Sequence, residues 1–517
     1  MMHCITKITT FGITSLIFMG FCLPIAEIAL ANSQNQSQDP ANKKGQRKNQ
    51  GQNPNQKKGV NQAKDKSKRG PAHVFSGDAP KHDYDLIMTR PTDKSITFSI
   101  LAYKPGQAYL EYSRNGRAEF VKTPTVELKP DMPVELVLGS IEPDMKYHYK
   151  LSTKFSESDG FKAAPQYSFH TQRKPGKAFS FAVQADSHMD QGTRPEIYQL
   201  TLENMNSYHP DLFIDLGDTF MTDKYRDYKA ALPQYIAQRY YFGLVGRSTP
   251  IFLTLGNHDG ERLDRYSPSG ESMSVWSNQT RTKYFPNPVP NDFYTGNDKE
   301  LQPLGKLQNY YEWKWGDAQF IVLDPFWPTK QRGRGDAEGN WTRTLGDDQF
   351  HWLEKVLSGS KTKYKFVFIH HLVGGLDESA RGGSEAAAMY EWGGQGAMNM
   401  DEFRRNRPEW SMPIHQLLVK NQVSVVFHGH DHFFAKQDLD GIVYLLVPQP
   451  GHSSSERMRS AEAYGYKKGD FLPPAGHVRV SVSSDRAKFD YIRTYSPQYE
   501  TNQHKNREIG YSFEIGK

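Results

Sequence analysis

The chain has 517 residues, of which 37% are hydrophobic, and a formal net charge of +6. This length exceeds what one ordinary hydrophobic core supports, so we expect two or three domains. A mean hydropathy of −0.72 excludes a polytopic membrane protein, and an aromatic content of 13% excludes a wholly disordered chain.

Residues 1–31 have the features of a secretory signal peptide. Lys7 precedes an apolar stretch that ends near Ala26, and a small–x–small cleavage site follows it. We therefore expect export to the periplasm or the extracellular space, with cleavage after Ala31. The alternative is a retained single-span anchor, but Pro24 interrupts the apolar stretch such an anchor requires.

The next segment, residues 32–72, is rich in Gln, Asn, Lys and Gly and has no hydrophobic periodicity. It holds ten basic and two acidic residues, a net charge of +8, whereas residues 73–517 together carry −2. We expect a disordered linker that makes electrostatic contact with an anionic cell surface. Because the folded part is nearly neutral, we expect no specific nucleic acid partner.

Both cysteines of the chain, Cys4 and Cys22, lie in the predicted signal peptide. The mature chain therefore has no disulfide bond and no thiolate ligand for a metal. Any metal chemistry must use oxygen and nitrogen ligands.

Residues 78–172 show short alternating segments separated by turn signals, which predict an all-β sandwich. The stretch from Leu138 to Tyr149 resembles the fibronectin type III pattern. The segment contains no cluster of metal ligands and no evident nucleophile. We expect it to act as a spacer or packing module.

From 178 to 497 the pattern changes to strands that alternate with helices, which predicts an α/β (α+β) domain. The carboxyl ends of strands in such a domain meet in one crevice. Glycines at 217, 256 and 429 would let the backbone approach a cluster there. Five apolar runs end in residues that can bind metals: Asp186 and His188; Asp218; Asn257, His258 and Asp259; His370 and His371; and His430 and His432.

So many ligands exceed the needs of one ion that also keeps room for substrate, and they suit two ions. The motifs D-x-H, G-D, G-N-H-D, a strand-end His and G-H-x-H occur in this order. In the order of these motifs, residues 180–495 resemble the calcineurin-like metallophosphoesterase superfamily. The resemblance implies a two-sheet ββ sandwich flanked by helices, and we expect residues 498–517 to form a C-terminal tail.

The resemblance also implies two divalent or trivalent metal ions, with Fe, Mn and Zn as candidates. His258 would face the substrate, and Asp259 would fix the orientation of its ring. The implied ligands are Asp186, His188 and His432 for the first ion, Asn257, His370 and His430 for the second, and Asp218 as a bridge between them.

Two such ions imply a phosphoric ester hydrolase. A hydroxide that bridges the ions would attack a small-molecule phosphate monoester or diester, and His258 would protonate the leaving oxygen. A nucleotidase or nuclease on the same metal core is an alternative. A non-catalytic cell-surface binding protein with a structural metal site is a further alternative, although His258 would then have no use. The sequence does not indicate an oligomeric state.

Purple acid phosphatases also pair a fibronectin-like domain with this metal core, but this chain departs from their pattern. Met221 stands where they have a Tyr, and His188 stands where their first motif has no His. We therefore expect no tyrosinate–iron site. We expect His371 and Arg381 to bind the substrate; Arg381 lies in an insertion, residues 372–415, and could clamp a phosphate.

Overall fold

The computed structural model describes residues 79–516, except 116, 191, 330–338, 373–380 and 453–460. The predicted signal peptide and linker, and part of the 372–415 insertion, lie outside the described residues. Within the described ranges, no helix is both long and apolar enough to cross a membrane.

The first large sheet has nine strands, and its central strands β10, β11 and β12 run parallel. Their residues are almost all buried, as expected for strands covered on both faces. In spatial order the sheet contains β25 (Ile509–Gly516), β24 (Arg486–Arg493), β23 (Gly476–Val482), β10 (Phe179–Gln184), β11 (Leu212–Asp215), β12 (Ile251–Leu253), β1 (Tyr84–Thr89), β2 (Ser95–Ala102) and β6 (Val134–Gly139).

The second large sheet has eight strands, of which β17, β18, β19 and β21 are successive parallel neighbours. In spatial order it contains β13 (Thr295–Gly296), β16 (Tyr311–Trp315), β17 (Ala318–Val322), β18 (Tyr364–Phe368), β19 (Val425–His428), β21 (Ile442–Leu446), β20 (Phe434–Leu439) and β22 (Asp470–Leu472). A separate short hairpin pairs β14 (Glu300–Leu301) with β15 (Gly305–Lys306).

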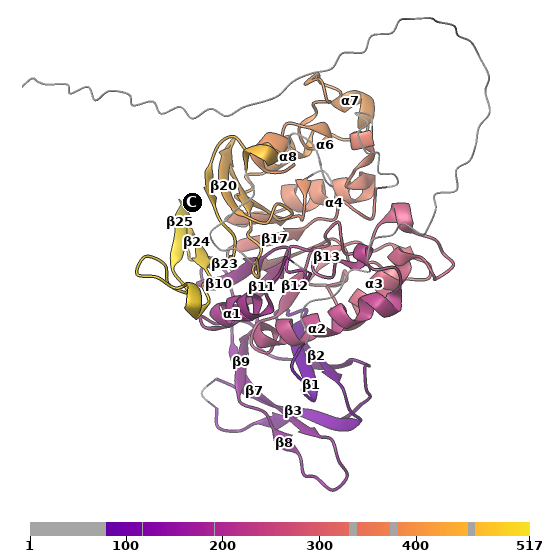
Figure 1. Ribbon diagram of the computed structural model, residues 1–517, viewed down its shortest axis with the longest axis vertical. Helices are drawn as coiled ribbons and strands as arrows, with labels where there is room; N and C mark the ends of the chain where they lie inside the picture. Colours follow the sequence, from indigo (N-terminus) through magenta and orange to yellow (C-terminus); the bar gives the residue numbers. More distant parts are fainter. Residues whose placement is uncertain are drawn as a thin grey trace, which may run out of the picture. The chain divides into compact units, whose positions relative to one another are not determined.

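Helices cover the outer faces of the two sheets (Figure 1). Helices α1 (Pro195–Asn206) and α2 (Tyr228–Gly246) pack on the first sheet, and α4 (Gly346–Ser358) and α8 (Ile414–Lys420) pack on the second. The remaining helices are α3 (Met273–Tyr284), α5 (Gly383–Ala386), α6 (Tyr390–Gly393) and α7 (Phe403–Asn406), and short 3-10 turns lie at 222–224, 263–265, 339–342, 462–464 and 497–499.

An aromatic core fills the space between the two sheets. Phe181 from the first sheet packs against Phe320, Phe366 and Phe427 from the second, with ring centroids 5.1 to 6.1 Å apart. Burial of such large side chains is the main driving force for stacking the sheets. The predicted two-sheet sandwich flanked by helices is therefore confirmed.

The N-terminal β region builds a second small sandwich. Its outer sheet contains β4 (Val121–Lys122), β3 (Gly106–Arg114), β7 (Lys146–Lys154) and β8 (Lys162–Ala163), with β5 (Val126–Leu128) and β9 (Tyr167–His170) beside it. Its inner strands are β1, β2 and β6, which also belong to the nine-stranded sheet because Thr89 pairs with Ile251 of β12. The two regions thus share one sheet.

The C-terminal residues continue the same sheet. The segment expected as a tail, 498–517, contains β25, which pairs antiparallel with β24. The ring of Phe513 stacks on that of Phe489, with centroids 4.6 Å apart. This contact joins the end of the chain to the aromatic core.

Candidate metal centre

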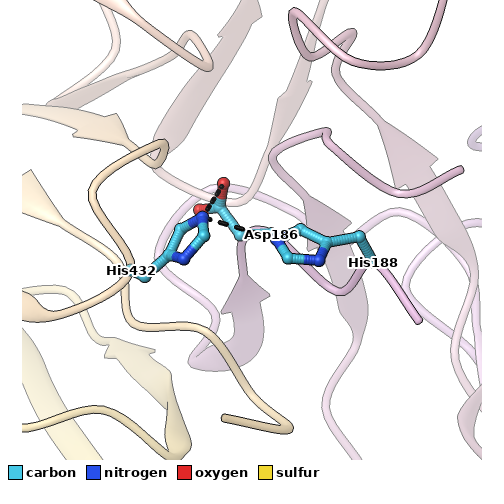
Figure 2. Close-up of side chains that lie close together, drawn as sticks. All are labelled: Asp186, His188 and His432. Atoms are coloured by element: carbon cyan, nitrogen blue, oxygen red, sulfur yellow. Dashed lines mark hydrogen bonds and ion pairs between the residues drawn. The ribbon is translucent and has the colours of Figure 1, made fainter. Parts of the chain in front are cut away.

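The five predicted strand ends converge on two groups of side chains. Asp186, which follows β10, lies with His188 and with His432, which follows β19 (Figure 2). Asp218, which follows β11, lies with His370 and His430. Within each group the ligand atoms lie within 4.8 Å of one another. The strand ends therefore bring these predicted residues together in two groups.

In the first group, two imidazole nitrogens and a carboxylate oxygen face one another. The Nε2 atoms of His188 and His432 are 3.4 Å apart, and the latter lies 3.5 Å from Oδ1 of Asp186. This carboxylate oxygen is buried and has no hydrogen-bond partner. The other nitrogen of His188, Nδ1, lies 3.2 Å from the Asp190 carboxylate, so Nε2 is the nitrogen turned to the group.

In the second group, His370 has a defined orientation. Its Nδ1 lies 2.9 Å from the carbonyl oxygen of Leu216, which fixes the proton on Nδ1. Its Nε2 then faces Oδ1 of Asn257 at 3.1 Å and Oδ2 of Asp218 at 3.2 Å. Three acceptors therefore meet with no proton between them.

Such an arrangement requires a positive charge. Burial alone would lower the pKa of His370, but the negative charges of Asp218 and Asp186 outweigh burial and raise it to about 10. A bound cation satisfies the same demand without protonating a ligand. Carboxylate, amide and imidazole ligands suit Fe, Mn and Zn, so the residues present fit the predicted metals.

Four of these residues hold a backbone conformation that side chains rarely adopt. The φ angles are 58° for Asp186, 54° for Asp218, 80° for His430 and 68° for His432. Non-glycine residues in this region cost about 1–3 kcal/mol each and persist where surrounding contacts impose them. The strain indicates that the positions of these side chains serve a function.

Glycine allows the strand ends to approach closely, as predicted. A Cβ atom on Gly429 would lie 2.8 Å from the Ala185 side chain and 2.9 Å from the Asp186 carboxylate. Any larger residue would push the loop of His430 and His432 away from the loop of Asp186.

The structure corrects the prediction for Asp259. Its carboxylate is buried and accepts backbone N–H groups from Asp218, Thr219, Phe220 and Gly256 at 2.7 to 3.1 Å. It therefore ties the Asp218 loop to the Asn257 loop and does not contact the His258 ring. Residues 257–259 lie in a turn, where the Asp259 N–H donates to the Gly256 carbonyl oxygen at 3.3 Å. The turn directs the Asp259 side chain to the Asp218 loop, which is why the neighbour in sequence is not the partner of His258.

The partner of His258 is Asp223. The two side chains are 2.8 Å apart, from Nδ1 to Oδ1, and the Asp223 N–H donates to the His258 carbonyl oxygen at 3.1 Å. The His258 side chain remains 25% exposed, so it can reach a substrate. Burial lowers its pKa, but Asp218 and Asp223 outweigh burial and the pKa is raised.

Arg381 lies beside the second group. Its Nη2 is 2.8 Å from Nε2 of His430, its Nε is 2.9 Å from Oδ1 of Asp431, and its guanidinium lies 4.1 Å above the Tyr464 ring. Asp431 in turn accepts a hydrogen bond from Tyr466 at 2.8 Å. The insertion thus places a positive charge next to the candidate metal centre.

The prediction that His371 contacts the substrate is corrected. This ring is fully buried, stacks on His430 with centroids 4.0 Å apart, and directs Nε2 to the carbonyl oxygen of Arg381. It positions its neighbours and cannot reach a substrate.

Sequence reasoning missed Asp190 and Asp223. Both follow a ligand motif closely, Asp190 two residues after His188 and Asp223 five residues after Asp218. The available signal was a carboxylate a few residues after each motif. The sequence does not show which histidine such a carboxylate contacts, because that depends on how the loop folds. The predicted bridging role of Asp218 stays a prediction.

Residues 179–434 match the family model described as calcineurin-like phosphoesterase. The chain carries a calcineurin-like phosphoesterase domain. This match covers every predicted ligand, from Asp186 to His432.

The phosphoesterase domain and the N-terminal β region together are similar in fold to solved structures. PhoD matches with a TM-score of 0.59 and 16% identity over 85% of this chain and 92% of its own. The purple acid phosphatase PPD1 from yellow lupin (Lupinus luteus) seeds matches with a TM-score of 0.54 and 14% identity over 83% of this chain and 74% of its own. At such identities the likeness concerns the fold alone. No curated protein matches the chain in sequence.

Proposed function

We propose that this protein is an exported, metal-dependent enzyme that hydrolyses phosphate monoesters or diesters. The observation that carries the proposal is the pair of ligand groups at the strand ends of the phosphoesterase domain, each composed of acceptor atoms that face one another. The predicted signal peptide supports export. When bound, two metal ions would activate a water molecule and neutralise charge on the phosphate.

His258 would supply the proton for the leaving oxygen. Asp223 holds its Nδ1 side, which leaves Nε2 as the atom that exchanges a proton with the substrate. A raised pKa favours the protonated ring near neutral pH, which is the form a general acid needs.

Arg381 would bind a phosphate oxygen. If Nδ1 of His430 coordinates a metal, Nε2 of the same ring carries the proton. The Nε2–H of His430 and the Nη2–H of Arg381 are then both donors, so their present contact cannot be a hydrogen bond. Nδ1 of His430 is buried without a hydrogen-bond partner, which makes it available as the ligand atom. We expect the guanidinium to turn from His430 to the phosphate when the centre is loaded.

The proposal is tested with residues 32–517 loaded with Mn²⁺, Zn²⁺ or Fe²⁺. The substrates are p-nitrophenyl phosphate, bis-p-nitrophenyl phosphate and an alkyl phosphate. We expect hydrolysis that a chelator abolishes and added metal restores, with two ions bound per chain. Asp218→Ala should lose both ions and all activity, whereas Asp438→Ala, at a side chain 65% exposed, should change neither. Fewer than one ion per loaded chain, or no hydrolysis of any ester, would contradict the proposal.

A further inference from the structure

A second set of polar side chains lies beneath the candidate metal centre and belongs to neither ligand group. At its middle is Asp215, the last residue of β11, which is fully buried. One carboxylate oxygen accepts from the Gly217 N–H at 3.1 Å and the Thr219 hydroxyl at 2.5 Å. The other accepts from Gln184 at 2.8 Å and the Ser187 hydroxyl at 3.2 Å. All four donors therefore converge on one side chain.

The donors come from two different ligand loops. Gln184 and Ser187 flank the start of the loop that carries Asp186 and His188. Gly217 and Thr219 flank Asp218. A single carboxylate thus joins the loop of the first ligand group to the loop of the second.

Gln238 on α2 makes the same connection through the backbone. Its Nε2 donates to the carbonyl oxygens of Ser187 at 3.0 Å and Thr219 at 2.9 Å. Its Oε1 accepts from the Tyr198 hydroxyl on α1 at 3.0 Å. Helix α2, supported by α1, therefore holds the loop of Asp186 and the loop of Asp218 at a fixed distance from each other.

Keeping a carboxylate here has an energetic cost. Burial raises the pKa of Asp215 to about 6, even though its hydrogen bonds favour the charged form. An apolar side chain would avoid this cost. It would not, however, connect two loops whose ligands, Asp186 and Asp218, both adopt positive φ angles.

We propose that Asp215, supported by Gln238, is a positioning residue that sets the separation of the two metal ions. Catalysis by two metals needs them about 3.5–4 Å apart, so that both act on one phosphate. The inference rests on the proposed dimetal function, because it concerns the relation between the two sites.

The test uses Mn²⁺ as the probe. Two adjacent Mn²⁺ ions give an exchange-coupled electron paramagnetic resonance spectrum, which a single or distant ion does not give. For Asp215→Ala we expect the half-maximal coupled signal to need about tenfold or more Mn²⁺ than in the unmodified protein, the lower bound typical of lost outer-shell contacts. We also expect kcat to fall more than KM rises.

Asp211 offers a matched control at the other end of the same strand. It is buried and immediately precedes β11, where Arg173 and the Ser180 N–H bind its carboxylate at 2.7 and 3.1 Å. Asp211→Ala removes a buried carboxylate next to β11 without touching either ligand loop. We expect it to lower stability and to leave the coupled signal unchanged.

Milder variants keep the test decisive if Asp215→Ala does not fold. Ser187→Ala and Thr219→Val each remove one donor, and Asp215→Asn keeps the shape and should restore part of the coupling. Unchanged coupling in all of these variants would overturn the inference. If the unmodified protein binds fewer than two Mn²⁺ ions and neither Zn²⁺ nor Fe²⁺ gives activity, the proposed function itself fails, which is a distinct outcome.

Discussion

At the scale of single residues, the pair formed by His258 and Asp223 makes the sharpest chemical prediction. His258→Ala should retain both metal ions but slow the hydrolysis of an alkyl phosphate by about 10²–10⁴-fold, the usual range for a general acid. p-Nitrophenyl phosphate should be affected much less, because its leaving group needs no proton. Asp223→Asn should slow the alkyl phosphate less than His258→Ala does, since it removes the negative charge that lies 2.8 Å from the ring but keeps an acceptor oxygen.

The ratio of kcat/KM for the two substrates is the measurement. Asp264→Asn is a suitable control, because Asp264 binds Arg262 in the neighbouring turn and does not contact His258. An alkyl phosphate hydrolysed by His258→Ala as fast as by the unmodified protein would remove His258 from the acid role.

Replacing Arg381 should weaken the binding of phosphate without weakening the binding of Mn²⁺. Arg381→Met keeps an apolar stem over Tyr464 but removes the charge beside His430. We expect inorganic phosphate to inhibit about tenfold less well, because a charge-assisted hydrogen bond is worth roughly 1.5–3 kcal/mol. We also expect Mn²⁺ to bind the second group at least as tightly as before, because no guanidinium then competes for His430.

Inhibition constants for phosphate and calorimetric Mn²⁺ titrations measure the two effects. Arg404→Met is the control, since Arg404 binds the carbonyl oxygens of Trp410 and Ser411. Weaker binding of Mn²⁺ together with unchanged phosphate inhibition would show that Arg381 supports the metal ligands instead.

Sequence motifs indicated the candidate ligands but not the residues that orient them. Asp186, Asp218 and His370 could be predicted because each comes two or three residues after a buried parallel strand. Their partners depend on how the loops fold back. Asp259 illustrates the difference, because it follows His258 in sequence yet binds the backbone of the Asp218 loop.

At the scale of elements, β25 shows what a periodicity argument could have found. Ile509, Tyr511, Phe513 and Ile515 alternate with smaller or polar residues, which is the pattern of a half-buried strand. By contrast, the pairing of β1 with β12 could not be predicted, because a single pair of residues, Thr89 and Ile251, joins these strands. Long-range contacts of this kind leave no local pattern.

Truncating Phe513 tests the contribution of β25 to stability. The ring is partly buried and stacks on Phe489. We expect Phe513→Ala to lower the free energy of unfolding by about 1–3 kcal/mol, less than for a fully buried Phe. Glu514→Ala should change it by less than about 0.5 kcal/mol, because that side chain is 44% exposed. Urea denaturation measures both, and equal effects would show that β25 adds no packing energy.

The Asp490 carboxylate on β24 makes the stability of these strands depend on pH. Arg479 on β23 and Ser512 on β25 bind its carboxylate at 2.8 and 2.7 Å. Burial raises its pKa, but these contacts outweigh burial and the folded pKa is lowered. The stabilisation is therefore present above the unfolded pKa, about 3.9, and is lost as pH falls through the folded value.

Unfolding of Asp490→Asn measured between pH 2 and pH 7 checks this sign. The difference in stability from the unmodified protein should be largest near neutral pH and should shrink below about pH 4. A difference that stays constant over this range would mean that the hydrogen-bond geometry, and not the charge, carries the contribution.

At the scale of the whole molecule, a shared sheet makes the N-terminal β region part of the phosphoesterase fold. The Tyr149 hydroxyl on β7 donates to the carbonyl oxygen of Arg247 at the end of α2, and Tyr284 on α3 donates to that of Asp131. Contacts of this kind cover surfaces that neither part could leave exposed. A spacer joined by a flexible linker would not need them, so the packing role is the better description.

Arg239 on α2 also connects the two regions. It is fully buried, and its guanidinium donates to the carbonyl oxygens of Ser99 on β2 at 2.8 Å and of Tyr284 at 2.7 Å. Burial lowers its pKa to about 10, so it remains charged at neutral pH. Arg239→Leu removes both of these buried hydrogen bonds from a charged donor, each worth about 1–3 kcal/mol.

We therefore expect Arg239→Leu to lower the free energy of unfolding by about 2–6 kcal/mol. We also expect scanning calorimetry of the unmodified protein to show one transition for both regions, because they share the nine-stranded sheet. Arg226→Leu, at a side chain 78% exposed, is the matched control and should leave the transition in place. Two separate transitions in the unmodified protein, with only the later one shifted by Arg239→Leu, would show that the β region folds on its own and that the shared sheet is not a source of cooperativity.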